Sequence, residues 1–228
     1  MMKAGIVVIL GAALGTLAAC DNGNGPPLPQ ASTLRALHAA RGGPSLTLFV
    51  DGARGSTLAF GQMSRTVFLS PGEHDLVFVP TDTTHSLIAL FNTTEGVDYS
   101  VFATDSIAAG THTIDPVFVL DTGAVPAAGH GRLRITSVAD SAPAIDAHRT
   151  QPDSAGLVAS AQPLNFRAVT PYFDGAAGAW SVVISHAGMS DTLLATGSIP
   201  IADGQAWTVV VLDSITGRVS WRLMQDRD

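Results

Sequence analysis

Cysteine and lysine are almost absent from this chain of 228 residues, which has one of each, Cys20 and Lys3. A single cysteine can form no disulfide within the chain, so the fold must be held together by its apolar core. A zinc site built on several thiolates is excluded for the same reason. The content of Ala, Val, Ile, Leu, Met, Phe, Trp, Tyr and Cys is 46%, which indicates a packed globular protein rather than a disordered one.

Positive charge is scarce as well. Twelve Lys and Arg face nineteen Asp and Glu, a formal net charge of −7, and removal of Lys3 with an N-terminal leader makes it −8. Binding to nucleic acid depends on clustered basic residues that neutralise phosphates. We therefore expect no nucleic-acid partner, and we interpret the negative charge as a contribution to solubility.

The common catalytic motifs are missing: there is no G-x-S-x-G, H-E-x-x-H, G-x-x-x-x-G-K or G-x-G-x-x-G. No two histidines are placed at metal-ligand spacing, and zinc needs three or four converging ligands. We predict no catalytic residue, no metal ligand and no cofactor, with exposed or capping roles for the histidines. These are His38, His74, His85, His112, His130, His148 and His186.

The N-terminus has the features of an export signal. After Lys3, residues 4–19 are apolar or small, and this run is shorter than the roughly 18–20 residues of a membrane-spanning helix. The segment Leu17–Cys20 resembles the bacterial lipobox. That resemblance implies cleavage before Cys20 and acylation of its sulfur, so we predict a lipid-anchored protein of the bacterial cell envelope. Asp21 leaves the choice between inner and outer membrane open.

The rest of the chain divides into two β-rich units. We predict a signal peptide at 1–19, the lipidated cysteine and a flexible tether at 20–32, a first domain at 33–122, a linker at 123–130 and a second domain at 131–228. Short alternating apolar segments separated by turn residues predict antiparallel strands. The strands expected in the first domain are 34–40, 46–50, 58–60, 66–69, 76–79, 87–91, 99–103 and 117–120.

An internal repeat supports this division. Residues 58–79 recur without a gap 106 positions later, where Leu58, Phe60 and Gly72 fall on Leu164, Phe166 and Gly178. The offset is 99 in the opening strands and 108 near the end, so the second copy carries about seven extra residues within 148–163 and two near position 200. Each unit is large enough to bury its own core. We therefore expect two tandem immunoglobulin-like antiparallel β-sandwiches.

The repeat also resembles a known family. Residues 131–147 and the motifs at Phe166, Val169–Thr170, Tyr172 and Ala177–Trp180 are similar to DUF4397, a bacterial domain of unknown function. The resemblance implies secreted or surface-anchored β-sandwich modules, often in tandem. It transfers no functional residue, because the family has no agreed activity.

Two kinds of ligand contact are compatible with the sequence. Segments 81–84 and 95–98 and Asp153 are Asp-rich enough to test for calcium, although turn chemistry explains them equally well. Tyr172 and Trp180 are candidate ligand-contact residues, because a shared exposed face would let them stack on a carbohydrate or peptide.

We predict a non-catalytic binding or structural module of the cell envelope, anchored in the membrane through Cys20, with a glycan or protein as ligand. An adhesin-like or polysaccharide-binding lipoprotein is the alternative within this class. The competing class is a metal-dependent hydrolase assembled from scattered Asp and His. Sandwich domains carry function in their loops, so the loop 148–163 is the first place to look for a site.

Overall fold

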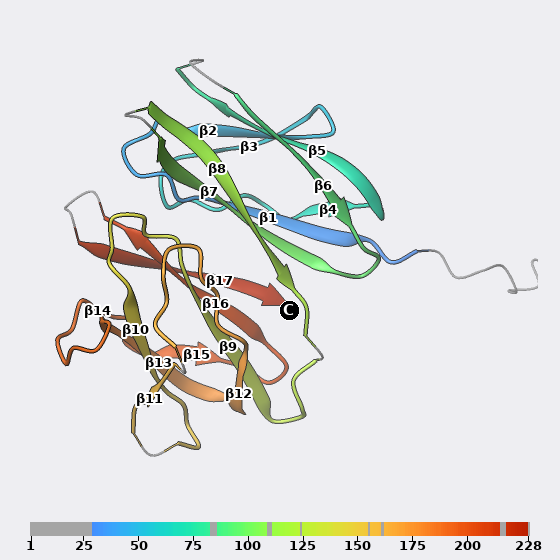
Figure 1. The fold of residues 1–228 in the computed structure, drawn as a ribbon. Coiled ribbons are helices and arrows are strands. Elements are labelled where there is room, and N and C mark those ends of the chain that lie inside the picture. Colours follow the sequence, from blue (N-terminus) through green and yellow to red (C-terminus); the bar gives the residue numbers. More distant parts are fainter. Residues whose placement is uncertain are drawn as a thin grey trace, which may run out of the picture.

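The computed structural model describes residues 29–82, 86–108, 111–123, 125–154, 156–160, 162–214 and 218–227. Its regular elements in these ranges are all β-strands, and they form two β-sandwiches that lie side by side (Figure 1). The predicted all-β, sandwich-type fold is confirmed. The signal segment, Cys20 and the tether up to residue 28 lie outside the described residues.

The first sandwich consists of two four-stranded sheets. One has the order β4-β1-β7-β8, and the other has the order β3-β2-β5-β6. The strands are β1 (Ser32–His38), β2 (Leu46–Val50), β3 (Ala53–Leu58), β4 (Val67–Leu69), β5 (Gly72–Pro80), β6 (Leu87–Thr93), β7 (Asp98–Ala108) and β8 (Thr111–Asp121).

The second sandwich repeats this plan. One sheet has the order β12-β9-β16-β17; the other has the order β11-β10-β13-β14, and β15 also pairs with β13. The strands are β9 (His130–Ser137), β10 (Ile145–Thr150), β11 (Val158–Ala159), β12 (Phe173–Ala176), β13 (Gly178–His186), β14 (Leu194–Ala195), β15 (Ile199–Ile201), β16 (Ala206–Asp213) and β17 (Val219–Arg227).

The strand registers follow the repeat found in the sequence. Leu46 pairs with Leu58 in the first sandwich, and their equivalents Ile145 and Leu164 pair in the second. The two residues are 12 positions apart in the first pair and 19 apart in the second, so the seven extra residues lie between Ile145 and Leu164. Part of this predicted loop is the short edge strand β11.

Each sandwich contains one parallel strand pair, so its sheets are mixed rather than purely antiparallel. β1 runs parallel to β7 and β9 runs parallel to β16, and every other strand pair described is antiparallel. The two parallel pairs have equivalent registers, with Leu34 opposite Tyr99 and Leu133 opposite Trp207. The first strand of each unit, β1 or β9, thereby lies beside the last strand but one of that unit, β7 or β16.

Each sandwich has its own apolar core. In the first, alternate residues of β1 and β7, such as Leu34 and Val101, point inward against Leu48 and Phe78 of the opposite sheet. In the second, Leu133, Ile135, Trp180, Val182 and Val209 belong to the equivalent core. This inward alternation is the period-two pattern on which the strand predictions rested.

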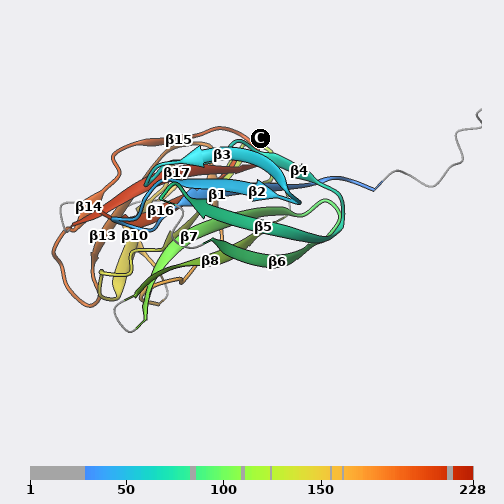
Figure 2. The ribbon, with the colours of Figure 1, turned by 90° about the horizontal axis from the view of Figure 1, so that it is seen from above.

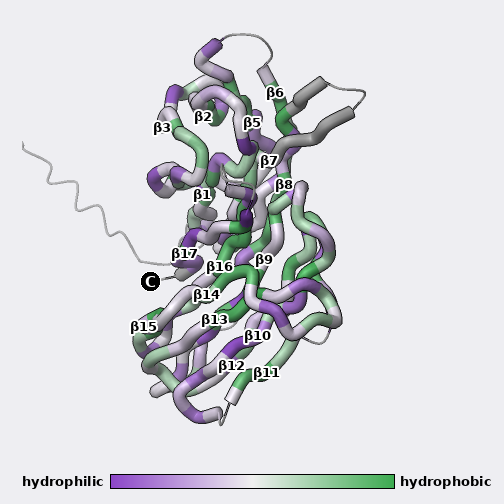
Figure 3. Tube along the Cα trace, turned by 90° about the vertical axis from the view of Figure 1, so that its left-hand side faces the viewer, coloured by the Kyte–Doolittle hydropathy of each residue, from purple (hydrophilic) through white to green (hydrophobic). Residues whose placement is uncertain are grey.

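A third core cluster lies between the two sandwiches. The remaining residues of β7 and β16, such as Phe102, Val210 and Leu212, point away from their own cores and are fully buried against the other domain. Figure 3 shows apolar stretches of β9 and β16 in the middle of the molecule, where the two units meet. The sheets β4-β1-β7-β8 and β12-β9-β16-β17 are therefore covered on both faces.

The same surface of each copy forms this interface. Ala39 of the first copy and Val138 of the second are both in the cluster, and so are the equivalent residues Phe102 and Val210. Val119 and Met224, which pair with the equivalent residues Ser100 and Thr208, complete the pattern. Two copies that meet through one self-complementary patch have the geometry of a twofold homodimer joined into a single chain.

One backbone feature has been kept in both copies at this interface. Gly61 has φ of 73°, and its equivalent Arg167 has φ of 69°. A Cβ at Gly61 would lie 2.7 Å from a guanidinium nitrogen of Arg222, whose Nε donates to the Gly61 carbonyl oxygen at 2.8 Å. Arg167 takes the same left-handed conformation with a full side chain, which costs of order 1 kcal/mol.

We expect fragments 31–123 and 130–228 each to unfold cooperatively, because each contains its own core, and to associate when they are mixed. Circular dichroism during urea unfolding and analytical ultracentrifugation measure the two properties. Phe102→Asp in the first fragment should abolish association and leave folding intact, since Phe102 lies only in the interface cluster. If neither fragment folds alone, the domain boundary is wrong.

Candidate functional site

The most densely connected polar site is buried between the two sandwiches. Arg134 of β9 forms an ion pair with Asp121 of β8, at the end of the first domain, and its Nε lies 3.6 Å from Asp226 of β17. The side chains of Arg134, Asp121 and Asp226 are 3%, 2% and 1% exposed. Charges this deeply buried persist only when they are paired and hydrogen-bonded.

The hydrogen bonds around these charges repeat the symmetry of the interface. Ser100 donates to Asp121 at 2.8 Å, and its equivalent Thr208 donates to Asp226 at 2.5 Å. Arg134 also donates from Nε to Thr208 Oγ1 at 2.7 Å and from Nη1 to the Leu120 carbonyl at 2.9 Å. Asp121 and Asp226 each lie two residues beyond equivalent apolar residues, Val119 and Met224.

Tyr172 belongs to this cluster. Its hydroxyl donates to Asp226 Oδ2 at 2.8 Å, and the guanidinium of Arg134 lies 4.7 Å from the centre of its ring. Burial, and then the charge of Asp226, raise the pKa of the Tyr172 phenol. Burial also raises the pKa of Asp226, by more than Arg134 lowers it. Tyr172 therefore remains a neutral hydrogen-bond donor, with a structural role at the interface.

The stacking patch proposed for Tyr172 and Trp180 is wrong. Trp180 is 1% exposed and belongs to the core of the second sandwich, with its Nε1 donating to the Ala176 carbonyl at 3.1 Å. Its copy-one equivalent His74 is also buried, 6% exposed. Position 180 therefore faces inward in β13, as position 74 does in β5, and Tyr172 and Trp180 share no exposed face.

Two of the histidines are buried, contrary to the expected exposed roles. His38 is 0% exposed and its Nε2 lies 2.9 Å from the Pro44 carbonyl oxygen. His74 bridges Asp51, at 2.7 Å, and the Ser70 carbonyl, at 2.8 Å, and so ties the β2–β3 turn to β5. His186 pairs with Asp191 at 2.6 Å. His85 and the side chain of His112 lie outside the described residues.

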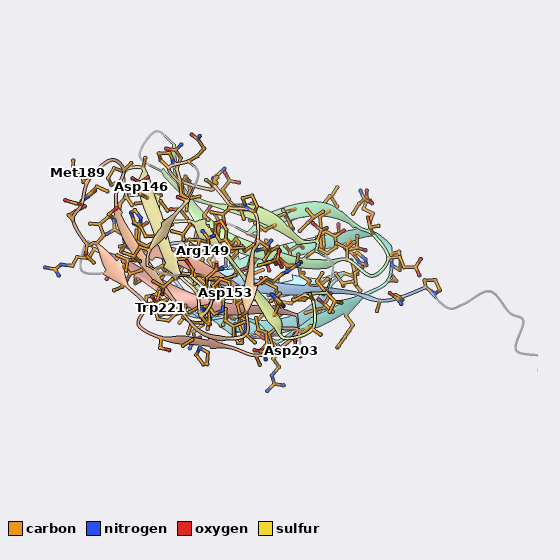
Figure 4. The ribbon with its side chains drawn as sticks, turned by 90° about the horizontal axis from the view of Figure 1, so that it is seen from below. Asp146, Arg149, Asp153, Met189, Asp203 and Trp221 are labelled. Atoms are coloured by element: carbon orange, nitrogen blue, oxygen red, sulfur yellow. The ribbon has the colours of Figure 1, made fainter. Side chains whose placement is uncertain are left out.

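The candidate calcium ligands at 95–98 and at Asp153 make ordinary structural contacts, and residues 83 and 84 of the segment 81–84 lie outside the described residues. Glu95 accepts from the Gln30 amide, Asp98 accepts from Thr33 Oγ1, and Asp153 accepts from Gln151 and from the Ala176 amide. Over the described ranges, no group of three or more His, Cys, Asp or Glu lies close enough to hold a metal ion. Figure 4 shows Asp153 near Arg149, whose guanidinium lies 3.7 Å from the ring centre of Phe173.

The described part of the chain also contains two open grooves that could accept a ligand. The first, about 440 Å³, lies at one end of the second sandwich and is lined by Ser141, Ala142, Pro143, His186, Thr192, Leu193, Arg218 and Val219. The second, about 480 Å³, lies between the free edges of β3 and β4 in the first sandwich and is lined by Leu48, Arg54, Gly55, Ser56, Ser64, Arg65 and Val67. Both volumes fall in the range of ligand sites.

The β3–β4 groove is shaped by a bulge. Gly55 and Ser56 of β3 together face Leu48 of β2, because Thr57 pairs with Thr47 and Arg54 pairs with Phe49. Bulges at sheet edges redirect side chains and interrupt regular pairing. Neither Arg54 nor Arg65 makes a side-chain hydrogen bond or ion pair with any residue that the structure describes. These two guanidinium groups are open to an anionic partner.

The sequence patterns missed both polar features. Arg134 follows Leu133 as Arg35 follows Leu34, so an arginine recurs on the outward face of an otherwise apolar strand. That recurrence was the available signal for the interface. Arg54 and Arg65 are eleven residues apart, and no spacing rule joins them, because a bulged edge and a loop bring them together.

Comparisons with known proteins identify one family. The pattern of the family described as "Domain of unknown function (DUF4397)" matches residues 32–148, which include the whole first sandwich and the first strands of the second. No curated protein matches.

Two solved structures are weakly similar. The Bacillus anthracis TIE protein matches with 11% identity and a TM-score of 0.26, over 80% of this chain and 34% of that chain. A leucine-rich repeat protein from Bacteroides thetaiotaomicron VPI-5482 matches with 10% identity and a TM-score of 0.19, over 78% of this chain and 25% of that one. The chain thus spans about a third and a quarter of their lengths.

We expect Arg134→Met to lower the free energy of unfolding by about 3–5 kcal/mol, because it leaves Asp121 charged and unpaired in the interior. Urea unfolding monitored by circular dichroism measures the change. Arg132→Met is the matched control: Arg132 pairs with Asp174, which is 57% exposed, so its loss should cost less than about 1 kcal/mol. Equal effects of the two changes would contradict the assigned role of Arg134.

A pH dependence follows from the His74–Asp51 pair. Burial lowers the pKa of His74, but the hydrogen bonds to Asp51 and Ser70 outweigh it and raise the pKa above 6.5. The stabilisation is complete below pH 6.5 and is lost as the pH rises through the folded pKa. Thermal unfolding from pH 6 to 9 should show this loss, of less than about 1 kcal/mol, in the wild type. Asp51→Asn should flatten the profile, and an unchanged slope would refute the link.

Proposed function

Because this chain belongs to the DUF4397 family, a domain of unknown function, we propose its role from its own residues: a membrane-anchored lipoprotein of the bacterial cell envelope that acts as a non-catalytic binding or structural module. The observation that carries the proposal is the Leu17–Cys20 segment at the end of an apolar leader. An acylated cysteine with more than one chain anchors a protein stably.

The spacing between this cysteine and the fold supports the proposal. The first strand begins at Ser32, twelve residues after Cys20, and those residues are rich in Gly, Asn and Pro. Such a segment is a tether that holds a folded body within about 40 Å of the bilayer. In the part of the chain that the structure describes, no helix has the length and apolar character needed to cross a membrane.

The two sandwiches are suited to act as one body. Their interface combines an apolar cluster with a buried ion pair, and an intrachain contact of this kind restricts relative domain motion. In a rigid two-domain body, the grooves and sheet edges of the first sandwich keep fixed positions relative to those of the second. This arrangement is a scaffold for binding rather than for a moving catalytic cleft.

A polysaccharide-binding or adhesin-like role is the second candidate. The β3–β4 groove and the groove at Pro143 and His186 are of a size that accepts a few sugar units. A glycan and peptide pull-down with the purified full chain addresses this candidate. Loss of binding on filling one groove would locate the ligand.

Cys20→Ala is the test of the anchor. In cells, the wild-type protein should partition into the detergent phase with the membrane fraction, and the variant should move to the aqueous phase because it cannot be acylated. Immunoblotting after phase separation measures both. Ser32→Ala is a control that leaves the lipobox intact and should stay in the detergent phase; retention of the Cys20→Ala variant there would refute the proposal.

A further inference from the structure

The end of the first sandwich at which the tether enters carries an unusual combination of side chains. Ser32, the first residue of β1, pairs with Leu69 of β4, and the next residue, Thr33, pairs with Phe68. Phe68 is 74% exposed, more than any other large apolar side chain described. A large aromatic ring in water is costly unless another surface covers it.

Two arginines without a side-chain partner among the described residues lie on the same edge. Val67, beside Phe68, lines the β3–β4 groove together with Arg54 and Arg65. Figure 2 places β3 and β4 along one side of the first sandwich, with β4 near the end where β1 begins. Aromatic rings and arginines are both side chains that settle at the interface between lipid headgroups and acyl chains.

Among the described residues, none of the acidic side chains at this end is paired with either arginine. Asp51 pairs with His74, Glu95 accepts from the Gln30 amide, and Asp98 accepts from Thr33. Although the chain as a whole is acidic, the guanidinium groups of Arg54 and Arg65 keep N–H donors that no described residue occupies. Such an edge attracts phosphate groups.

The length of the tether brings this edge to the bilayer. Pro29 is the first described residue, and it lies nine residues after Cys20, a reach of at most about 30 Å. A cysteine held in the membrane therefore keeps Phe68, which lies beside the strand that the tether enters, at a high effective concentration next to lipid. A single aromatic contact too weak to recruit a free protein becomes significant under this condition.

We propose that the β3–β4 edge of the first sandwich docks onto the phospholipid surface that holds the anchor, with Phe68 inserted among the headgroups and Arg54 and Arg65 bound to lipid phosphates. The inference rests on the lipid anchor proposed above. Docking fixes the orientation of the two-domain body relative to the membrane. Each arginine near an anionic surface strengthens binding by about five-fold.

The test uses the full-length lipidated chain in vesicles of brominated phosphatidylcholine and phosphatidylglycerol. Phe68→Trp should give tryptophan emission that shifts to shorter wavelength and loses intensity through bromine quenching. Met189→Trp is the matched control, because Met189 is 63% exposed and lies at the opposite end of the molecule from β1 (Figure 4). The three tryptophans of the chain itself, Trp180, Trp207 and Trp221, contribute the same background emission to both variants.

Charge reversal separates the arginines from the ring. Arg54→Glu with Arg65→Glu, added to Phe68→Trp, should abolish the quenching, whereas Arg218→Glu, in the groove of the second sandwich, should leave it unchanged. Equal emission at positions 68 and 189, or quenching that survives the double reversal, would overturn the proposal. Flotation distinguishes this failure from loss of the anchor: a chain that floats without quenching at position 68 has the anchor and lacks the docking.

Discussion

The ion pair between Arg134 and Asp121 is the interaction on which the two-domain arrangement depends. Arg134 belongs to the second sandwich and Asp121 to the first, and both side chains are almost completely buried. A buried charge without its partner costs several kcal/mol, so neither domain can leave the other without exposing or stranding these groups. Apolar contacts around Phe102 and Val210 provide the buried surface of the interface. The ion pair selects the orientation of the two domains in which Arg134 lies beside Asp121.

The interface also explains what the duplication has preserved. Ser100 and Thr208, and Asp121 and Asp226, occupy equivalent places around Arg134. The symmetry is broken at the centre, because Arg134 alone contacts both acids, and burial favours the protonated form of Asp226. Arg134 therefore contacts both acids, and burial raises the pKa of Asp226. Gly61 and Arg167 show the same history: one backbone conformation has been retained, and the side chains have diverged.

The strand content and the repeat register could be predicted from the sequence, because alternation between inward and outward residues leaves a direct trace. Leu34, Val101 and Leu133 point inward as that pattern requires. Exposure could not be predicted, since it depends on what covers the outward face. By its sequence, Phe102 is an ordinary surface position, and only the second sandwich buries it. The burial of Trp180 could not be predicted, because nothing in its local sequence distinguishes the two faces of β13. The groove lined by Arg54 and Arg65 could not be predicted either. These two arginines converge because of a bulge in β3, and only the pairing of β2 with β3 reveals where that bulge lies.

The parallel pairing of β1 with β7 has a mechanical consequence. A pull applied through the N-terminal segment acts along the axis of β1, and it loads all six residue pairs between Thr33–Asp98 and His38–Ala103 at once. Hydrogen bonds loaded together in shear resist far more force than bonds opened one by one from an end. β1 is also held by β4 on its other side, and its outward residue Leu37 is locked into the interface cluster. The pairing of β1 thus resists a pull applied at the N-terminus, which is the direction in which the proposed lipid anchor would load the fold.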